Sequence, residues 1–191
     1  MKVLRKVSFY LILLISISLT SSCKRVHNYF LLKQFYNKQM NFSGDYWRVT
    51  GDTAVQGNPI QALGPINLIS YLDEHLCAPC LSNYLNAGLR YTYAFESDSL
   101  KYICIAYPRE MTDLQEAING LSEKEVTIFY DVNNVFFENN KLDRLMPDVP
   151  KSFLVDRYGK IILVGDPITS EPLYKLYRKN IRMQLEEMSK Q

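Results

Sequence analysis

The 191-residue sequence has almost no excess charge, because its formal net charge is only +2. Basic residues form no long run outside the N-terminal segment. Domains that bind nucleic acid concentrate lysine and arginine on one surface, so we expect no nucleic-acid partner. Internal repeats and low-complexity segments are also lacking. The composition is 47% apolar and 22% charged, which is typical of a globular fold.

The sequence also lacks an apolar stretch long enough for a comfortable membrane span. The stretch Val7–Leu19 follows three basic residues and precedes small polar ones, which is the order of a secretory signal. Leu19–Cys23 resembles the lipobox of bacterial lipoproteins. This resemblance implies cleavage before Cys23 and lipid on Cys23, which anchors the chain in a membrane, facing the periplasm. Lys24 is no retention signal in the enterobacterial sense, so the outer membrane is favoured.

An uncleaved signal anchor is the alternative reading of this N-terminus. Either reading places the rest of the chain outside the cytoplasm, where disulfides persist. With Cys23 lipidated, three cysteines remain, and this odd count excludes a fully paired disulfide framework.

Two of these cysteines form the tetrad Cys77-Ala78-Pro79-Cys80. The tetrad follows the apolar run Ile66–Leu72 and precedes the helix-length segment Leu81–Leu89, so both thiols are predicted at a strand-to-helix junction. Unpaired N–H groups and the helix dipole stabilise a thiolate at a helix N-terminus. Cys77 is therefore a candidate nucleophile, and Cys80, one turn later, can close a disulfide with it.

The predicted organisation is a signal at residues 1–22, a tether and N-terminal extension at 23–57, and one domain at 58–191. In the extension, Val26–Phe42 has helical character. Gly44–Pro65 is predicted to be irregular, apart from a short strand of the edge type at Tyr46–Val49.

Strands and helices then alternate along the domain. The predicted strands are Ile66–Leu72, Tyr102–Ala106, Val126–Tyr130, Ser152–Val155 and Lys160–Val164. The predicted helices are Leu81–Leu89, Thr112–Asn119, Val135–Asn140 and Glu171–Met188. The turn Asp156–Gly159 makes the last two strands an antiparallel hairpin.

This order, with a C-x-x-C at the start of the first helix, resembles the thioredoxin fold over about Asn58–Met188. The segment Asp148–Ile161 looks like the family segment in which a cis-proline precedes two strands joined by a D-x-x-G turn. The extra βα unit at Val126–Asn140 is similar to the insertion of the TlpA-like, membrane-anchored branch and of the peroxiredoxins. The resemblance implies an α/β fold with a central mixed sheet flanked by helices, an N-terminal extension and an extra βα insertion.

The resemblance also implies a thiol–disulfide oxidoreductase, which in this branch mostly reduces protein disulfides. Cys77 attacks the substrate disulfide and Cys80 resolves the mixed disulfide. The backbone of Val149, turned by a cis bond to Pro150, holds an extended substrate strand. No metal or organic cofactor is required, and the expected partners are protein thiols or disulfides and an upstream redox protein.

Two departures from the family pattern keep a second function open. Tyr71 stands where thioredoxins commonly have a buried acid, and Leu76 stands where they have an aromatic residue. Asp73, Glu74 and His75 crowd the loop. As an alternative, any of them tunes the pKa of Cys77, a protonated His75 downward and the carboxylates upward, but the favoured expectation is that they are solvated loop charges. Without the acid, a binding lipoprotein that keeps the fold but has no turnover is an alternative.

Two further alternatives concern the cysteines. His75, Cys77, Cys80 and Cys104 in principle supply four zinc ligands, but Cys104 is predicted inside a buried strand and the others crowd one loop. A peroxidase would resemble a chain with threonine three residues before the attacking cysteine, and this chain has none there. We expect Cys104 to be a buried, apolar-like residue.

Overall fold

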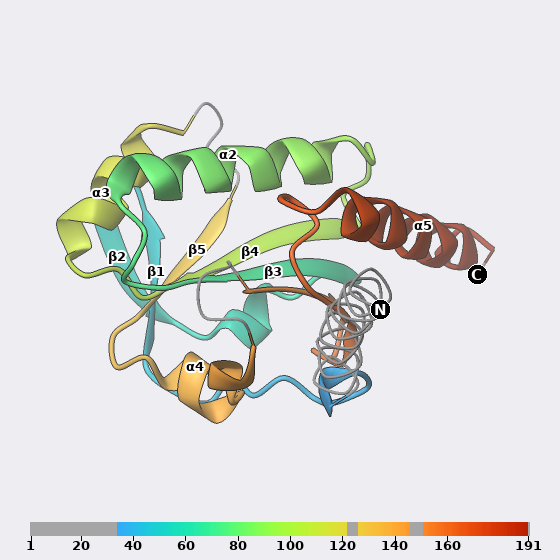
Figure 1. Ribbon diagram of the computed structural model, residues 1–191, viewed down its shortest axis with the longest axis horizontal. Coiled ribbons are helices and arrows are strands. Elements are labelled where there is room, and N and C mark those ends of the chain that lie inside the picture. Colours follow the sequence, from blue (N-terminus) through green and yellow to red (C-terminus); the bar gives the residue numbers. More distant parts are fainter. Residues whose placement is uncertain (1–33, 122–125, 146–150, 191) are drawn as a thin grey trace, which may run out of the picture. The chain divides into compact units, whose positions relative to one another are not determined.

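The computed structural model describes residues 34–121, 126–145 and 151–190 (Figure 1). The chain divides into two compact units, residues 1–35 and 36–191. Only Gln34 and Phe35 of the first unit are described, so the architecture given below is that of the second. Within the described ranges, no helix is both long and apolar enough to cross a membrane.

The described strands form a single seven-stranded mixed sheet in the order β2-β1-β5-β4-β3-β6-β7. β3, β4 and β5 run parallel to one another, and every other neighbouring pair is antiparallel. The strands are β1 Tyr46–Thr50, β2 Thr53–Gly57, β3 Ile66–Leu72, β4 Leu100–Ala106, β5 Thr127–Asp131, β6 Lys151–Asp156 and β7 Ile161–Val164. β3 is buried at every position, as expected of a central strand covered on both faces.

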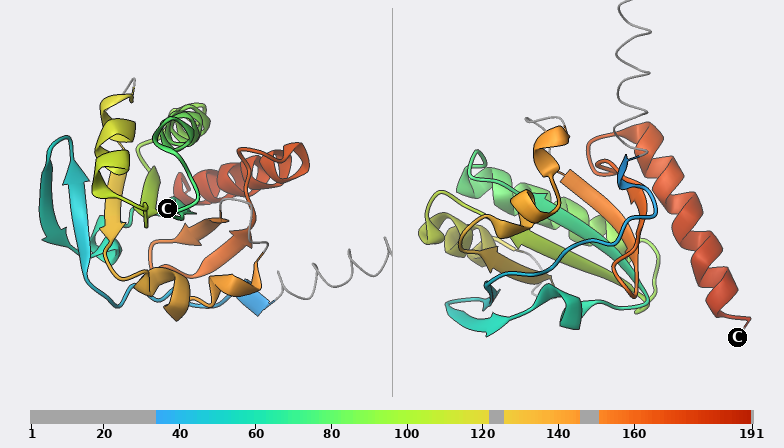
Figure 2. Two further views of the ribbon diagram at one scale, coloured as in Figure 1. Left: turned by 60° about the vertical axis from the view of Figure 1, so that its left-hand side comes forward. Right: turned by 90° about the horizontal axis from the view of Figure 1, so that it is seen from below.

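Helices cover both faces of this sheet, with α2 and α3 on one face and α4 on the other (Figures 1 and 2). The helices are η1 Pro59–Ala62, α2 Ala78–Tyr93, α3 Met111–Asn119, α4 Val135–Asn139, η2 Leu142–Arg144 and α5 Glu171–Met188. The main core lies between α2, α5 and the sheet, where Leu81 and Leu85 pack with Leu68, Leu154 and Tyr177. The predicted mixed sheet flanked by helices is confirmed.

The helix that follows the cysteine tetrad is longer than predicted. The prediction ended it near Gly88, but α2 continues to Tyr93. A Cβ atom at Gly88 would overlap the ring of Tyr102 on β4. This glycine therefore permits close approach of α2 to the sheet and does not end the helix, a distinction that only the packing reveals.

The segment Gly44–Pro65 is more ordered than predicted. β1 is not at the edge, because it lies between β2 and β5, and β2 was missed altogether. Gly51, with φ of +56°, provides the turn between these two strands. β2 has no buried position in its first four residues, so its sequence carries no alternating apolar pattern that would have predicted a strand.

The predicted helix Val26–Phe42 is wrong in its described C-terminal part. Residues 38–42 are not helical, and Asn37 has φ of 63°, which ends any helix there. Met40 N–H donates to the Gly159 carbonyl at 2.9 Å, and the side chains of Met40 and Phe42 are buried. Pairing with the β6–β7 turn thus outweighs helical propensity. Residues 26–33 lie outside the described residues.

Candidate active site

Cys77 is the N-cap residue of α2, with extended backbone angles, φ of −70° and ψ of 158°. Its sulfur accepts a hydrogen bond from Cys80 N–H at 3.3 Å, and its carbonyl accepts from Leu81 N–H at 2.9 Å. Cys77 and Cys80 form a disulfide across a Cα–Cα distance of 5.1 Å. The predicted junction is therefore confirmed, and it places Cys77 Sγ at the unpaired N–H groups of the helix.

The local sequence explains this position. Pro79 stands in the first turn of α2, where its missing N–H removes no helical hydrogen bond. The first turn contains no acidic residue, so no carboxylate competes with a Cys77 thiolate for the positive end of the helix dipole. Both cysteines are exposed, so exposure class does not distinguish them, and the helix terminus favours the thiolate of Cys77.

The loop before Cys77 is organised by Asp73. The Asp73 carbonyl accepts from Leu76 N–H at 3.4 Å, and the carboxylate oxygen Oδ1 accepts from His75 N–H at 3.2 Å. These bonds fold residues 73–76 into a turn that delivers the chain from β3 to the start of α2. Glu74 and His75 are exposed, as expected of solvated loop residues, whereas Asp73 is only 23% exposed and its other carboxylate oxygen, Oδ2, pairs with Lys151 Nζ at 3.8 Å.

Lys151 is the first residue of β6 and lies directly opposite Tyr71 of β3. The end of β3 that leads to the thiols is therefore next to the start of β6. Val149 and Pro150, the predicted substrate-binding residues, immediately precede Lys151 and lie outside the described residues, as does Cys23. Their roles remain predictions, and so does the cis Val149–Pro150 bond.

A hollow of about 240 Å³ lies beside the turn that precedes Cys77. Tyr71, Phe137 and Lys151 line it together with the loop residues Asp73 and His75. Burial, followed by the charge of Asp73, raises the pKa of the Tyr71 hydroxyl well above its usual range, so this group stays neutral. Tyr71, which stands where a buried acid was expected, is thus an aromatic wall of this hollow.

A buried polar network lies beneath α2 on the opposite face of β3. The Tyr84 hydroxyl, one helical turn after Cys80, donates to Asp166 Oδ1 at 2.8 Å and lies 2.8 Å from Ser152 Oγ. Ser152 Oγ also lies 3.0 Å from Ser70 Oγ. The network ties α2 to β3, β6 and the loop before α5. Its members come from two strands, a helix and a loop, and their spacing in the sequence gave no sign that they meet.

Cys104 has a different environment from Cys77 and Cys80. It is fully buried within β4, and burial raises the pKa of its thiol well above the usual range. The expected burial of Cys104 in a strand is therefore confirmed, and its behaviour as a small apolar residue stays a prediction. Among the described residues, no three His, Cys, Asp or Glu side chains are placed to hold a metal ion together. The four proposed zinc ligands are therefore not brought together.

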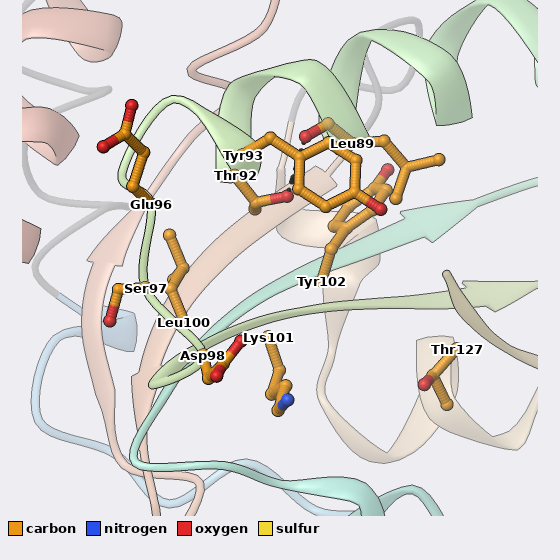
Figure 3. Close-up of a pocket in the computed structure, with 10 residues that line it drawn as sticks. All are labelled: Leu89, Thr92, Tyr93, Glu96, Ser97, Asp98, Leu100, Lys101, Tyr102 and Thr127. Atoms are coloured by element: carbon orange, nitrogen blue, oxygen red, sulfur yellow. Dashed lines mark hydrogen bonds between the residues drawn. The ribbon is translucent and has the colours of Figure 1, made fainter. Parts of the chain in front are cut away.

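Another hollow, of about 220 Å³, lies at the other end of α2 (Figure 3). Figure 3 shows it between the last turn of α2, the loop carrying Glu96, Ser97 and Asp98, and the start of β4. At about 1.5 Å per residue, α2 spans roughly 22 Å between Ala78 and Tyr93, so this hollow is separate from the thiols.

No protein-family model matches this sequence, and no match was found among curated proteins. Solved structures are similar in fold. The thioredoxin domain of a thiol-disulfide oxidoreductase from Bacteroides vulgatus aligns with a TM-score of 0.53 and 16% identity, over 75% of this chain and 96% of that one. A thiol:disulfide interchange protein from a Bacteroides species gives 0.50 and 15%, over 74% and 89%.

A thioredoxin-like protein from Bacteroides caccae aligns with a TM-score of 0.50 and 16% identity, over 74% of this chain and 50% of that one. At such identities the likeness concerns the fold. The chain therefore has a thioredoxin-like fold, with a C-x-x-C pair at the start of α2.

Proposed function

We propose that this protein is a lipid-anchored, extracytoplasmic thiol–disulfide oxidoreductase that reduces protein disulfides. The observation that carries the proposal is the exposed Cys77–Cys80 disulfide at the N-terminus of α2. A thiolate at this position is stabilised by the helix terminus and is accessible to a large substrate. The structural neighbours named as oxidoreductases support the same reaction class.

The reaction transfers two electrons in two exchanges. The Cys77 thiolate attacks one sulfur of a substrate disulfide, which breaks that bond, forms a mixed disulfide and releases the other sulfur as a thiolate. The Cys80 thiolate then attacks Cys77 Sγ, which releases the second substrate sulfur. The substrate gains two electrons and takes two protons overall, and the protein is left with the Cys77–Cys80 disulfide. An upstream dithiol partner reduces that disulfide again.

Substrate docking is assigned to the backbone of Val149 ahead of Pro150. β6 begins directly after these residues, and its first residue lies opposite Tyr71 at the end of β3. A substrate strand beside Val149 would therefore lie at the same end of the sheet as the thiols. A high-resolution crystal structure that shows a trans Val149–Pro150 bond would remove this part of the proposal.

Membrane attachment is assigned to Cys23, on the basis of the lipobox-like Leu19–Cys23. Cells expressing the full chain and fed labelled palmitate should label the wild type and not Cys23→Ala. Membrane fractionation should place the wild type in the outer membrane, facing the periplasm. Label on Cys23→Ala would reject the anchor and leave the redox proposal standing.

Reduction of insulin by the purified protein, with dithiothreitol as electron source, tests turnover directly. The wild type should accelerate insulin precipitation, and Cys77→Ser should not. Cys80→Ser should accumulate mixed disulfides with substrate proteins on Cys77, because the resolving thiol is gone. Absence of both turnover and trapping would favour the alternative, a thioredoxin-fold binding lipoprotein.

A further inference from the structure

Lys151 is a buried cation beside the candidate active site. Its side chain is only 4% exposed, which is rare for lysine without a charged partner. Nζ lies 5.5 Å from the ring centre of Phe137 and 6.0 Å from that of Tyr71. Its ionic partner is Asp73 Oδ2, at 3.8 Å. The two rings cover Lys151, while the Asp73 side chain is 23% exposed, so the pair is partly buried and its charges act through a lower dielectric than fully exposed charges do.

Lys151 and Asp73 belong to two different segments that border the candidate active site. Lys151 begins β6, directly after the segment assigned to substrate docking. Asp73 shapes the turn before Cys77, since its carbonyl and carboxylate accept hydrogen bonds from Leu76 and His75. The ion pair thus joins the docking side to the turn that positions the nucleophile. Its Asp73 charge lies only four residues before Cys77.

We propose that the Lys151–Asp73 ion pair is a positioning device that neutralises Asp73 in the turn before Cys77 and so sets the reactivity of Cys77. This inference rests on the proposed function and names the residues that tune it. A bare carboxylate near Cys77 disfavours the thiolate, and a bare ammonium group favours it. In the ion pair these two effects oppose each other. Removal of the lysine should therefore raise the pKa of Cys77, and removal of the carboxylate should lower it.

Other ionisable groups also face this region and must be held constant. Around the hollow they are Glu74 and His75 of the loop, Tyr107 after β4, Asp143 of η2, and Tyr71 of β3. None of them is altered in the variants described below. Differences between variants therefore do not arise from changes in these groups.

The experiment measures alkylation of Cys77 against pH in a Cys80→Ser background, where Cys77 is the exposed thiol. Lys151→Met should slow alkylation at neutral pH by up to about tenfold, because an uncompensated carboxylate raises the pKa of Cys77 by up to about one unit. Asp73→Asn should accelerate it, since the amide oxygen of the new side chain can still accept from His75 N–H while the charge is gone. The double variant should return close to the parent rate.

Two controls separate charge from packing. Lys151→Arg keeps the cation and should stay near the parent rate. Lys175→Met removes the cation of an exposed ion pair with Glu171 on α5 and should change nothing. Urea unfolding shows whether each variant is folded. If Lys151→Met is not folded, Lys151→Gln takes its place.

The glutathione equilibrium of the intact C-x-x-C pair gives an independent readout. Lys151→Met should shift it towards the disulfide and Asp73→Asn towards the dithiol, because the thiolate stabilises the reduced form. Shifts of both single variants in the same direction would show a purely structural role and overturn the inference, as would no shift in either. Loss of insulin reduction in the wild type would instead reject the proposed function, while the alkylation rates would still be measurable.

Discussion

Cys77 and Cys80 lie at the exposed start of α2, whereas Cys104 lies in β4 with no exposed surface. All three thiols belong to one small domain and differ in backbone context. At the helix N-terminus, unpaired N–H groups favour the thiolate, while inside the sheet burial raises the pKa of the Cys104 thiol well above its usual range. Location in the fold therefore decides how readily a cysteine forms a thiolate here.

The burial of Cys104 also explains why this unpaired cysteine is expected to be unreactive in the folded domain. A buried neutral thiol is a poor nucleophile and packs as a small apolar residue. Cys104 belongs to the core cluster that includes Leu72, Leu81 and Tyr84. The domain thus keeps a third thiol close to α2 but inaccessible to large molecules.

The largest expected effect separates the two thiol environments by labelling. In the reduced protein, iodoacetamide should modify Cys77 and Cys80 in the folded state and Cys104 only in opened molecules. Because domains unfold with about 5–15 kcal/mol, labelling of Cys104 should be slower by a factor of at least about a thousand. Peptide mass spectrometry at increasing urea concentrations measures this. Equal labelling of all three cysteines without urea would show that Cys104 is as accessible as Cys77 and Cys80.

The next largest effect concerns the network that joins the redox helix to the sheet. Tyr84→Phe removes a hydroxyl that donates to buried Asp166, and should lower the free energy of unfolding by about 1–3 kcal/mol. Tyr158→Phe is the matched control, because Tyr158 is 69% exposed, and should change little. Urea unfolding of both variants tests this, and equal losses would show that the buried network adds nothing.

The free energy of unfolding at alkaline pH should also depend on the buried thiol of Cys104. In the oxidised protein Cys104 is the thiol left to titrate within the described domain. Its folded pKa is raised by burial, so the unfolded state loses its proton first as pH rises. Stability should therefore fall above about pH 8.5, by at most about 1.4 kcal/mol per pH unit from this group.

Cys104→Val removes this contribution, while the buried tyrosines Tyr84 and Tyr177 titrate at higher pH in both proteins. The charge of Cys104 also raises the pKa of Tyr102, so the two proteins are compared below about pH 10, where tyrosines begin to titrate in the unfolded state. The difference in unfolding free energy between wild type and Cys104→Val at successive pH values isolates the thiol. A difference that is flat with pH would show that Cys104 is not desolvated in the folded state.

The smallest expected effect is on turnover. Cys104→Val should keep insulin reduction within about twofold of the wild type, because a buried thiol acts as an apolar side chain. Rates are compared at a protein concentration corrected for the folded fraction. Loss of turnover in a folded Cys104→Val protein would show that the third cysteine carries electrons.

The sequence alone determined the order of elements from Ile66 onward, the redox tetrad and the burial of Cys104. These features depend on signals that act over a few residues: apolar runs for strands, periodicity for helices, and Pro79 in the first turn. The thiol environment follows directly, because the N-terminus of a helix has the same unpaired N–H groups in any fold.

Two features could not be predicted from the sequence, namely the continuation of α2 through Gly88 and the place of β1 between β2 and β5. Both depend on contacts with distant segments, since Gly88 faces Tyr102 and β1 pairs with β5. No local pattern encodes such partners, because strand register and close packing are set by the whole assembled sheet.

The same reason separates the thiols from the groups that surround them. The bond between Tyr84 and Asp166 spans 82 residues, and Lys151 meets Asp73 only because β6 pairs with β3. In the sequence, Asp73 is a loop charge and Lys151 is a polar residue at a strand start. Strand pairing brings them together and excludes water from Lys151. The position of Cys77 at a helix N-terminus could therefore be predicted from local sequence, whereas the charges around it were brought there by the fold.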